Sequence, residues 1–270
     1  IFDHFSMGAK KKDMVEWRKL VEKDKNPGKE ITIAIVGKYA HLEDAYLSIK
    51  ESLHHAGINN DCKVNIKWIE AEDLHEKGAK HYLKDVRGII VPGGFGVRGT
   101  EGKMDAITYV RENNIPFLGI CYGLHMSVIE FARNICDMKD ANTTEAETPT
   151  KYPVIDLMNE QKKTEDKGGT MRLGAYDCEI VPGTLAHKVY GKTHISERHR
   201  HRWEVNNKFK KDMECKGLVV SGINKKRDLV EIIELKDHPY FIAVQFHPEF
   251  KSRIEKPAPL FDGLVKAALS

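Results

Sequence analysis

The sequence is poor in cysteine, and its cysteines form no pattern. Only five occur among 270 residues, at positions 62, 121, 136, 178 and 215. Their number is odd, they are widely spaced, and no Cys-x-x-Cys pair occurs, which argues against both a disulfide framework and a zinc site. We therefore expect a reducing compartment, the cytoplasm, and a chain that holds no metal.

Long apolar runs and a strong net charge are lacking as well. No run approaches the roughly 18 residues of a membrane-spanning helix, and no signal peptide is visible. The formal net charge is only +3, although 31% of the residues are charged. A charge this small gives no indication of a nucleic acid partner. Neither a membrane nor a nucleic acid is expected to bind this chain.

The first half of the chain alternates strands and helices. Residues 31–36 are apolar and β-branched, as in a parallel strand that is covered on both faces. Further strands are predicted at residues 64–69, 88–91 and 116–120, and helices at residues 44–55, 74–83 and 105–112. This alternation predicts an α/β fold with a doubly wound, mostly parallel sheet.

The second half contains mainly strands. They are predicted at residues 173–180, 198–205, 218–223, 229–235 and 241–245, before a last helix at residues 259–269. This pattern predicts an antiparallel extension of the same sheet. Residues 160–169 are polar and end in glycine, so we interpret them as a mobile loop. Residues 1–29 are lysine-rich and lack an initiator methionine, and we interpret them as a linker to a missing upstream part.

Cys121 is the most informative residue, because it lies between a strand that ends at Ile120 and a helical pattern that begins at Leu124. Gly119 and Gly123 stand two positions to either side. A nucleophile at such a turn is typical of a nucleophile elbow, where glycines let the backbone pass closely. The N-terminus of the following helix favours the thiolate. The competing interpretation is an ordinary buried cysteine at the end of a strand.

A histidine and a carboxylate near the C-terminus supply the other half of a triad. They are His247 and Glu249, separated only by Pro248. With Cys121 they would form a Cys-His-Glu triad, in which the histidine transfers protons and the carboxylate orients it. Because His247 alone could be a turn residue before Pro248, the prediction rests on all three residues together.

A glycine loop at residues 92–96 follows the third predicted strand, at the edge where open α/β sheets bind ligands. We predict that the backbone N–H groups of Gly94 and Tyr122 form the oxyanion hole of a thioester-forming reaction. A phosphate-binding loop is the alternative. It is weaker, because no Lys-Ser or Lys-Thr pair follows and the Rossmann spacing is absent.

Residues 198–202 alternate arginine and histidine. In a strand, the three arginines would share one face and the two histidines the other. The histidines could bind a metal ion, but no carboxylate or cysteine at a suitable spacing accompanies them. An arginine that binds a carboxylate through a bidentate contact is the simpler interpretation of this segment. Glu145 lies in a polar loop, where it could cap a turn or bind an ammonium group.

Several segments resemble the class I (triad) glutamine amidotransferases, and more closely the C-terminal glutaminase domain of the CTP synthase family. They are residues 36–39, 44–46, 91–102, 140–142, 168–174, 197–206 and 245–250. The strings at 168–174 and 198–202 are more specific than the triad. The resemblance implies a glutaminase domain at residues 30–270 and, at residues 1–29, a connector from a missing N-terminal synthetase domain.

The resemblance also implies the reaction, which is hydrolysis of L-glutamine to glutamate and ammonia through a cysteinyl thioester. In the whole enzyme, a C–N ligase, the ammonia would pass to the synthetase domain, which converts UTP to CTP in pyrimidine biosynthesis. ATP and Mg²⁺ are expected only on that domain, and no cofactor is expected on this chain. GTP would activate the whole enzyme through a lid at residues 161–169. The whole enzyme is expected to be a homotetramer, and the isolated domain a monomer or a dimer.

By the same resemblance, Glu145 would face the α-ammonium group of glutamine and Arg202 its α-carboxylate. The implied glutamine pocket comprises Gly94, Phe95, Tyr122, Gly123, Leu124, His125, Glu145 and Arg202.

Two residues depart from the family pattern, because Tyr122 stands in place of leucine and His125 in place of glutamine. Histidine titrates near pH ~6.5, so glutamine binding is expected to be weaker or more pH-dependent. Two alternatives stay open. One is another Cys-His-Glu hydrolase of the same fold, such as a γ-glutamyl hydrolase, and the other is a non-catalytic assembly domain.

Overall fold

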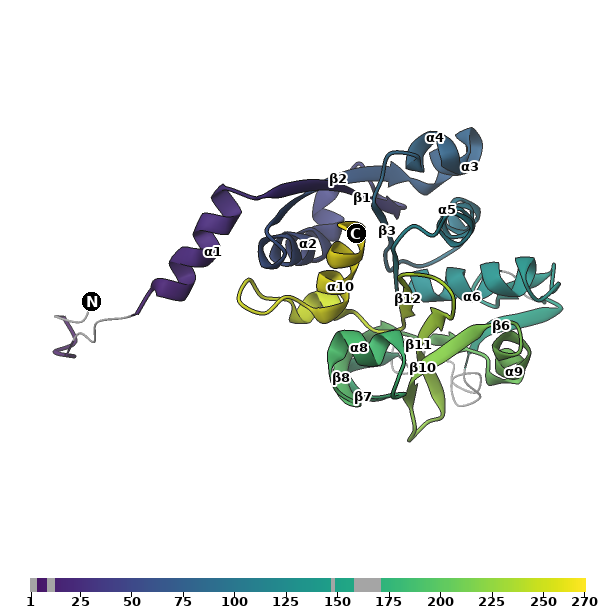
Figure 1. The fold of residues 1–270 in the computed structure, drawn as a ribbon. Coiled ribbons are helices and arrows are strands. Elements are labelled where there is room, and N and C mark those ends of the chain that lie inside the picture. The colour runs from purple at the N-terminus through teal and green to yellow at the C-terminus, as the bar shows by residue number, and fades with distance from the viewer. Residues whose placement is uncertain (1–3, 9–12, 147–148, 158–170) are drawn as a thin grey trace.

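The computed structural model describes residues 4–8, 13–146, 149–157 and 171–270. The lid predicted at residues 161–169 and the first residues of the 168–174 string lie outside the described residues. Helix α1 (Val15–Lys25) projects from the body of the chain and carries no buried residue (Figure 1). Its assignment to a connector stays a prediction.

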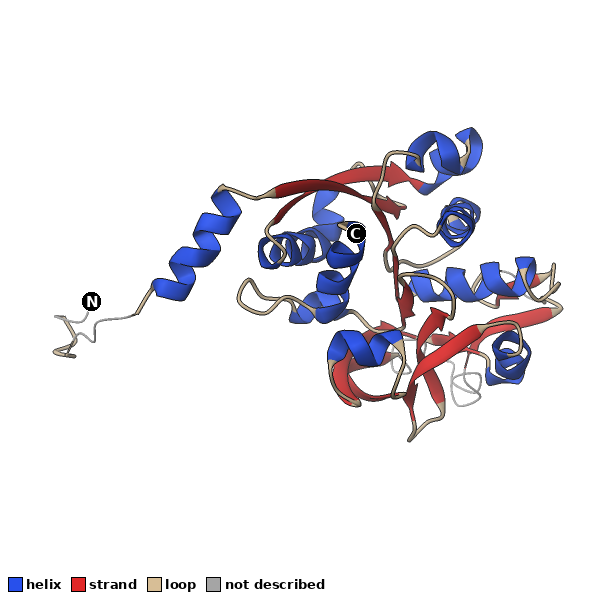
Figure 2. Cartoon of the chain, viewed as in Figure 1, coloured by secondary structure: helices blue, strands red, loops and turns tan. Residues whose placement is uncertain are grey.

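A nine-stranded sheet forms the centre of the fold (Figure 2). Its parallel half runs in the order β2 (Cys62–Glu70), β1 (Lys29–Gly37), β3 (Gly88–Val91), β4 (Phe117–Ile120) and β12 (Phe241–Val244). In β1, Ile33 and Ile35 face one layer of helices, while Ala34 and Val36 face the other, and all four are fully buried. Apolar residues on both faces are the mark of a parallel strand covered on both sides. The predicted doubly wound sheet is confirmed.

The predicted antiparallel extension is confirmed as well. Beyond β12 the sheet continues through β11 (Leu229–Leu235), β10 (Leu218–Asn224), β7 (Arg172–Ile180) and β8 (His194–His201). The single strand predicted at residues 198–205 is wrong, because the chain leaves the sheet at Arg202. It continues in a second, three-stranded sheet of β5 (Ala141–Thr143), β6 (Tyr152–Leu157) and β9 (Trp203–Val205). Strands this short have too few residues for the sequence pattern to predict.

Two layers of helices cover the large sheet (Figure 1). One layer contains α2 (Leu47–Asn59), α8 (Leu185–Tyr190) and α10 (Pro259–Ala268). The other contains α3 (Ala71–Lys77), α4 (Ala79–Leu83), α5 (Thr100–Asn113), α6 (Tyr122–Asn134) and α9 (Lys210–Glu214). Short 3-10 helices occupy Glu43–Tyr46, Asn207–Phe209 and Pro248–Lys251. The single helix predicted at residues 74–83 is two helices, because Gly78 ends α3 with a φ of 86°.

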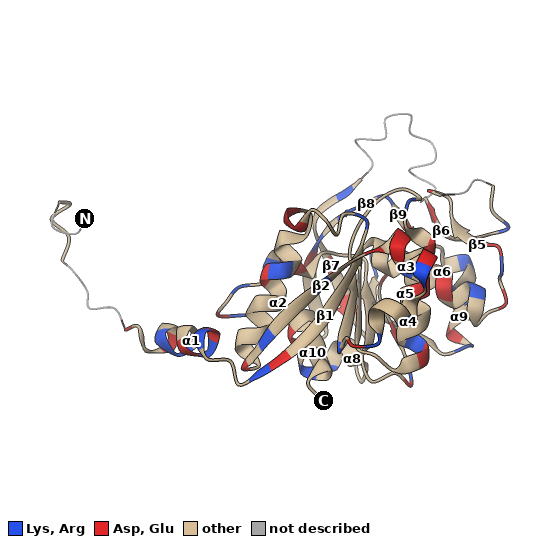
Figure 3. Cartoon of the chain, turned by 90° about the horizontal axis from the view of Figure 1, so that it is seen from above, with Lys and Arg blue, Asp and Glu red and all other residues tan. Residues whose placement is uncertain are grey.

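Charges of both signs are interspersed over the surface helices (Figure 3). In the described part of the chain, no helix is both long enough and apolar enough to cross a membrane. All five cysteines are free thiols in the structure.

Candidate active site

Neighbouring parallel strands bring the predicted catalytic residues together. Strand β4 lies between β3 and β12, and Ile120 is opposite Val244. The amide of Cys121 donates to the carbonyl oxygen of Val244 at 2.7 Å, so the chain beyond β12 leaves the sheet beside the nucleophile. The glycine loop leaves β3 on the other side of β4. Residues far apart in sequence therefore meet at the carboxyl edge of the sheet, where open α/β folds bind ligands.

Cys121 has a strained backbone. It joins β4 to α6 with φ 52° and ψ −99°, a conformation that is rare for any residue with a Cβ atom. A Cβ atom on Gly123 would lie only 2.2 Å from the carbonyl oxygen of Val91, and one on Gly119 would lie 2.8 Å from the Cβ atom of Ala243. Close packing thus requires the two glycines, and the sharp turn is made by the cysteine itself, as in a nucleophile elbow.

His247 and Glu249 form a tight pair. Nδ1 of His247 lies 2.7 Å from Oε1 of Glu249, and the His247 amide donates to the carbonyl oxygen of Arg198 at 2.8 Å. Burial by itself would lower the pKa of His247, but its interactions with Cys121 and with Glu249 outweigh burial and raise the pKa to about 10. The ring is therefore an imidazolium at neutral pH, next to the Cys121 side chain.

The nucleophile and the base face each other across Gly93. A Cβ atom on Gly93 would lie 3.0 Å from Cε1 and 3.8 Å from Nε2 of His247, and 3.6 Å from Cβ of Cys121. A side chain here would intrude into the space between the two reacting groups. Glycine at this position keeps that space open.

A cleft of about 240 Å³ opens onto this pair. Cys121 and His247 line it together with Gly94 and Phe95 of the glycine loop. Residues 44–49, from the 3-10 helix before α2 and the first turn of α2, form another wall. Further lining residues are Pro92, Gly93, Arg200, Glu249 and Phe250. The residues predicted to be nucleophile, base, orienting carboxylate and oxyanion loop thus share one cavity.

The oxyanion donors proposed from the sequence are available in this geometry. Tyr122 is the first residue of α6, where a backbone N–H has no acceptor within the helix. Within the described part of the chain, the amides of Tyr122 and Gly94 have no hydrogen-bond acceptor. Both could therefore donate to a negative oxygen that develops on a substrate beside Cys121.

Glu145 and Arg202 lie near each other beside the glycine loop. Oε1 of Glu145 accepts a hydrogen bond of 2.9 Å from the amide of Gly96. Burial raises the pKa of Glu145, and this hydrogen bond and the Arg202 guanidinium oppose the increase. Nε of Arg202 is buried and has no partner among the described residues. A buried donor without a partner is ready to bind a carboxylate.

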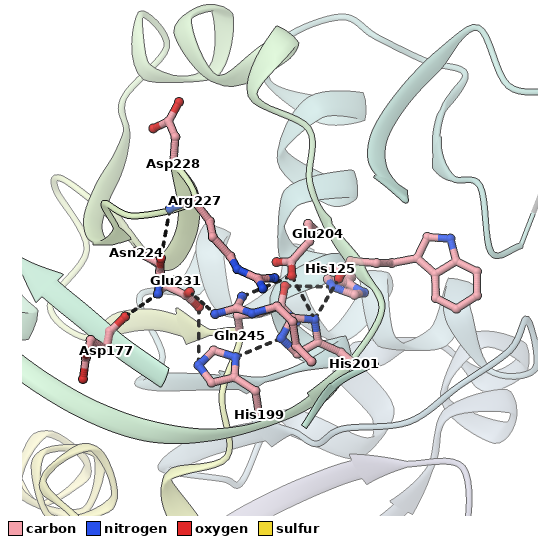
Figure 4. Close-up of polar contacts among 12 residues, drawn as sticks. His125, Asp177, His199, His201, Glu204, Asn224, Arg227, Asp228, Glu231 and Gln245 are labelled. Carbon is pink, nitrogen blue, oxygen red and sulfur yellow. Dashed lines mark hydrogen bonds and ion pairs between the residues drawn. The ribbon is translucent and has the colours of Figure 1, made fainter. Parts of the chain in front are cut away.

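His125 and Leu124 point away from the cleft. Leu124 is fully buried in the apolar core on the α6 side of the sheet. Nε2 of His125 lies 3.0 Å from Oε1 of Gln245, deep in a polar cluster (Figure 4). Burial lowers the pKa of His125 to about 4. The expectation that His125 titrates near pH 6.5 is therefore wrong, because a buried imidazole resists protonation.

Arg172, Glu204 and Glu231 form a buried charge cluster that the sequence patterns did not indicate, and Figure 4 labels the two glutamates among their polar neighbours. Arg172 donates to Glu204 at 3.1 Å and to Glu231 at 2.7 Å. A ring nitrogen of His199 lies 2.9 Å from one of His201. Glu231 stands within the apolar run of β11, and this is the sequence signal for the cluster, because a charge in a buried strand needs a partner.

The predicted alternation is confirmed for residues 198–201 but not for Arg202, which lies beyond the end of β8 and is half-buried. His199 and His201 are buried, whereas Arg198 and Arg200 are exposed. Among the described residues, no group of three or more His, Cys, Asp or Glu side chains could hold a metal ion.

Comparison with known proteins places this site in a family. The family model described as glutamine amidotransferase class-I matches residues 41–267. The CTP synthase of Thermococcus gammatolerans is 59% identical over 259 residues, which are 95% of this chain and 48% of that protein. The CTP synthase of Caldanaerobacter subterraneus subsp. tengcongensis is 55% identical over 258 residues, 96% of this chain and 48% of that protein.

The chain thus spans about half the length of these curated relatives. A solved structure, the glutaminase domain of Trypanosoma brucei CTPS with bound acivicin, is 35% identical, with a TM-score of 0.83. The match covers 88% of this chain and 94% of that one. The chain therefore belongs to the class I glutamine amidotransferases, and within them to the glutaminase domains of the CTP synthase family.

Proposed function

We propose that this chain hydrolyses L-glutamine to glutamate and ammonia through a thioester on Cys121. One observation carries the proposal: a cysteine on a strained strand-to-helix turn faces a His247–Glu249 pair across a cleft that a glycine loop borders. A thiolate, a proton donor and two free backbone N–H groups are what acyl transfer from an amide requires.

In the first half of the reaction, the Cys121 thiolate attacks the carbon of the side-chain amide. The C–S bond forms as the carbonyl π electrons move onto oxygen, and the amides of Gly94 and Tyr122 stabilise that oxyanion. The tetrahedral intermediate then collapses and the C–N bond breaks. The His247 imidazolium gives its proton to the departing nitrogen, which leaves as ammonia. A glutamyl thioester and a neutral imidazole remain.

In the second half, water attacks the thioester. Neutral His247 takes a proton from the water as its oxygen bonds to the thioester carbon, and the Cys121 thiolate is expelled from the new tetrahedral intermediate. Glutamate leaves and the thiolate–imidazolium pair is restored. Glu249 keeps Nδ1 of His247 protonated throughout and stabilises the imidazolium, so Nε2 exchanges the proton.

Two charged residues would hold the amino acid end of glutamine. Arg202 has a buried Nε that finds no partner in the described parts of the chain and can bind the α-carboxylate, and Glu145 is the neighbouring carboxylate for the α-ammonium group. Phe95 and Gly94 supply the wall over the side chain. The charges are opposite in sign and adjacent, as a zwitterionic substrate demands.

For the whole protein we propose the role that the names of the CTP synthase relatives suggest. Ammonia from this domain would pass to a synthetase domain, which aminates UTP to CTP with ATP and Mg²⁺, and GTP would activate glutamine hydrolysis through residues 161–169. Residues 1–29 would connect the domains, and the assembly would be a homotetramer in the cytoplasm. These proposals rest on relatives twice as long as this chain.

Intact mass spectrometry with a chloromethyl ketone analogue of glutamine, in which CH₂Cl replaces the amide nitrogen, tests the proposal. We expect one adduct, on Cys121, that excess glutamine slows and that the Cys121→Ser variant lacks. Exposed Cys215 provides an internal control for indiscriminate alkylation. An adduct that a γ-glutamyl peptide slows and free glutamine does not would instead indicate a γ-glutamyl hydrolase. A wild-type chain that forms no adduct on Cys121 would refute the proposal.

A further inference from the structure

We propose that Tyr122 is a positioning residue. Its phenol hydroxyl, together with the Glu145 carboxylate, fixes the glycine loop so that the Gly94 amide points at the oxyanion. This inference rests on the proposed glutaminase reaction and adds a residue to it. Tyr122 would then serve the reaction twice, since its own backbone N–H is the second oxyanion donor.

The two side chains hold both polar backbone groups of Gly96. The Tyr122 hydroxyl donates to the carbonyl oxygen of Gly96 at 2.6 Å, and the Gly96 amide donates to Oε1 of Glu145 at 2.9 Å. Gly96 has a φ of 75°, which only glycine adopts readily. A third bond, from Nζ of Lys38 to the carbonyl oxygen of Phe95 at 3.3 Å, holds the residue before it.

Tyr122 cannot swing out of this position. Its side chain is 1% exposed, and Nζ of Lys103 lies 5.0 Å from the centre of its ring, in cation–π contact. Lys103 is 2% exposed, and its Nζ lies 3.7 Å from where a Cβ atom on Gly94 would be. The glycine loop therefore rests on a buried tyrosine and a buried lysine.

A glycine loop needs such support if it is to act as an oxyanion hole. Glycine loses more conformational freedom on ordering than any other residue, and three of the five residues in the loop are glycine. Oxyanion donors are effective only when they are already in place before the charge develops. Hydrogen bonds from outside the loop supply that order, and the Tyr122 hydroxyl is the one that comes from the helix of the nucleophile.

Glu145 links this support to substrate binding. In the proposed function the same carboxylate binds the α-ammonium group of glutamine, while one of its oxygens already holds Gly96. A glutamine analogue without the α-ammonium group would not hold the Glu145 carboxylate in place, so the glycine loop would be less firmly fixed. Recognition of the amino acid end and stabilisation of the oxyanion at the other end of the substrate thus share one side chain.

Two electrophiles separate positioning of the loop from reactivity of the thiolate. The chloromethyl ketone analogue is attacked at its carbonyl, so an alkoxide forms before sulfur displaces chloride, and labelling depends on the oxyanion donors. Iodoacetamide is attacked at its CH₂ group with loss of iodide and forms no alkoxide. The matched control is Tyr240→Phe, because the Tyr240 hydroxyl also donates to a backbone carbonyl, that of Leu260 at 2.7 Å, and is buried away from the cleft.

We expect Tyr122→Phe to lower the maximal rate of ketone labelling about tenfold, part of the roughly 10²–10³-fold loss that removal of an oxyanion donor causes. The half-saturating ketone concentration and the iodoacetamide rate should stay within about twofold of wild type. Amide hydrogen exchange in residues 92–97 should become faster. Tyr240→Phe should change none of these. Glu145→Ala, which removes the acceptor for the Gly96 amide, should also speed exchange in residues 92–97.

Unchanged ketone labelling and unchanged exchange in Tyr122→Phe would overturn the inference, while leaving the proposed function intact if wild type reacts and glutamine protects it. An equal loss with both electrophiles would also overturn it, because the hydroxyl would then support the thiolate rather than the loop. A wild-type chain that does not react with the ketone would overturn the inference and the proposed function together.

Discussion

Replacing Arg172 by methionine tests how the buried charge cluster is balanced. Arg172 is 1% exposed, and its partners Glu204 and Glu231 are 2% and 0% exposed. Methionine keeps much of the side-chain volume and removes the charge, so both carboxylates lose their counter-ion. Loss of one partner from a buried ion pair costs about 3–5 kcal/mol in the free energy of unfolding.

This cost depends on pH, because the carboxyl groups can keep protons instead. Burial raises the pKa of Glu204 to about 8 and that of Glu231 to about 7, although Arg172 opposes both shifts. Without Arg172 both pKa values rise further, so the folded variant retains protons that the unfolded chain releases above about pH 4.3. Its free energy of unfolding therefore falls as pH rises from about 5 to 9, and more steeply than that of the wild type. Each unit by which the loss of Arg172 raises the pKa of a carboxyl group lowers the free energy of unfolding of the variant at high pH by about 1.4 kcal/mol relative to wild type.

Urea unfolding followed by tryptophan fluorescence at pH 5.5 and pH 9 measures both effects. The control is Lys63→Met, which removes one partner of an exposed ion pair with Glu30 at 3.4 Å and should cost no more than about 1 kcal/mol at either pH. At pH 9 we expect Arg172→Met to lose several times more stability than the control, and at pH 5.5, where both carboxyl groups hold protons, we expect a smaller loss. A loss at pH 9 no larger than that of Lys63→Met, or one that is equal at the two pH values, would refute the reasoning.

Three further predictions concern the elbow and the triad. Glu249→Gln removes the carboxylate 2.7 Å from Nδ1 of His247. The pKa of His247 should then fall from about 10, so the upper pH limit of ketone labelling should move down and the rate should drop by about 10²–10⁴-fold. A pH–rate profile with an unmoved upper limit would contradict this. Cys121→Gly should abolish labelling and, because it relieves a φ of 52°, raise the free energy of unfolding by on the order of 1 kcal/mol; a less stable variant in urea would speak against strain. Gly123→Ala puts a Cβ atom 2.2 Å from the carbonyl oxygen of Val91 and should cost about 1–3 kcal/mol, visible as a lower Tm by calorimetry, whereas an unchanged Tm would mean that α6 can shift.

Sequence patterns predict the parallel half of the fold well, because its strands are buried on both faces. All four residues of β4 are buried, as are all four of β12, so each is a short apolar run that ends where the chemistry begins. Helix α5 is the crossover that joins β3 to β4, whereas β12 reaches its place beside β4 from the antiparallel half of the sheet; together the three strands bring Cys121 and His247 to one edge. Glycines beside the cysteine are local signals of the turn and need no knowledge of tertiary structure.

What the sequence could not predict depends on contacts between distant strands. The direction of His125 is decided by Gln245, which β12 places beside the first turn of α6. The sequence around Tyr122 does not predict the hydrogen bond from its hydroxyl to the carbonyl oxygen of Gly96, because that contact exists only once β3 and α6 have packed together. Arg202 appeared to lie within one strand, yet it is the point at which the chain passes from the large sheet to the small one.

The position of β12 has a consequence for the order in which the site comes into being. This strand is near the end of the chain, but it lies in the middle of the sheet, between β4 and β11. A chain still attached to the ribosome, with synthesis stopped before Phe241, has its nucleophile and its glycine loop but neither the base nor the strand that holds the two halves of the sheet together. Because a chain is made from its N-terminus, Cys121 is without His247 until more than a hundred further residues have been added. Completion of the sheet and assembly of the Cys121–His247 pair therefore both wait for the same segment.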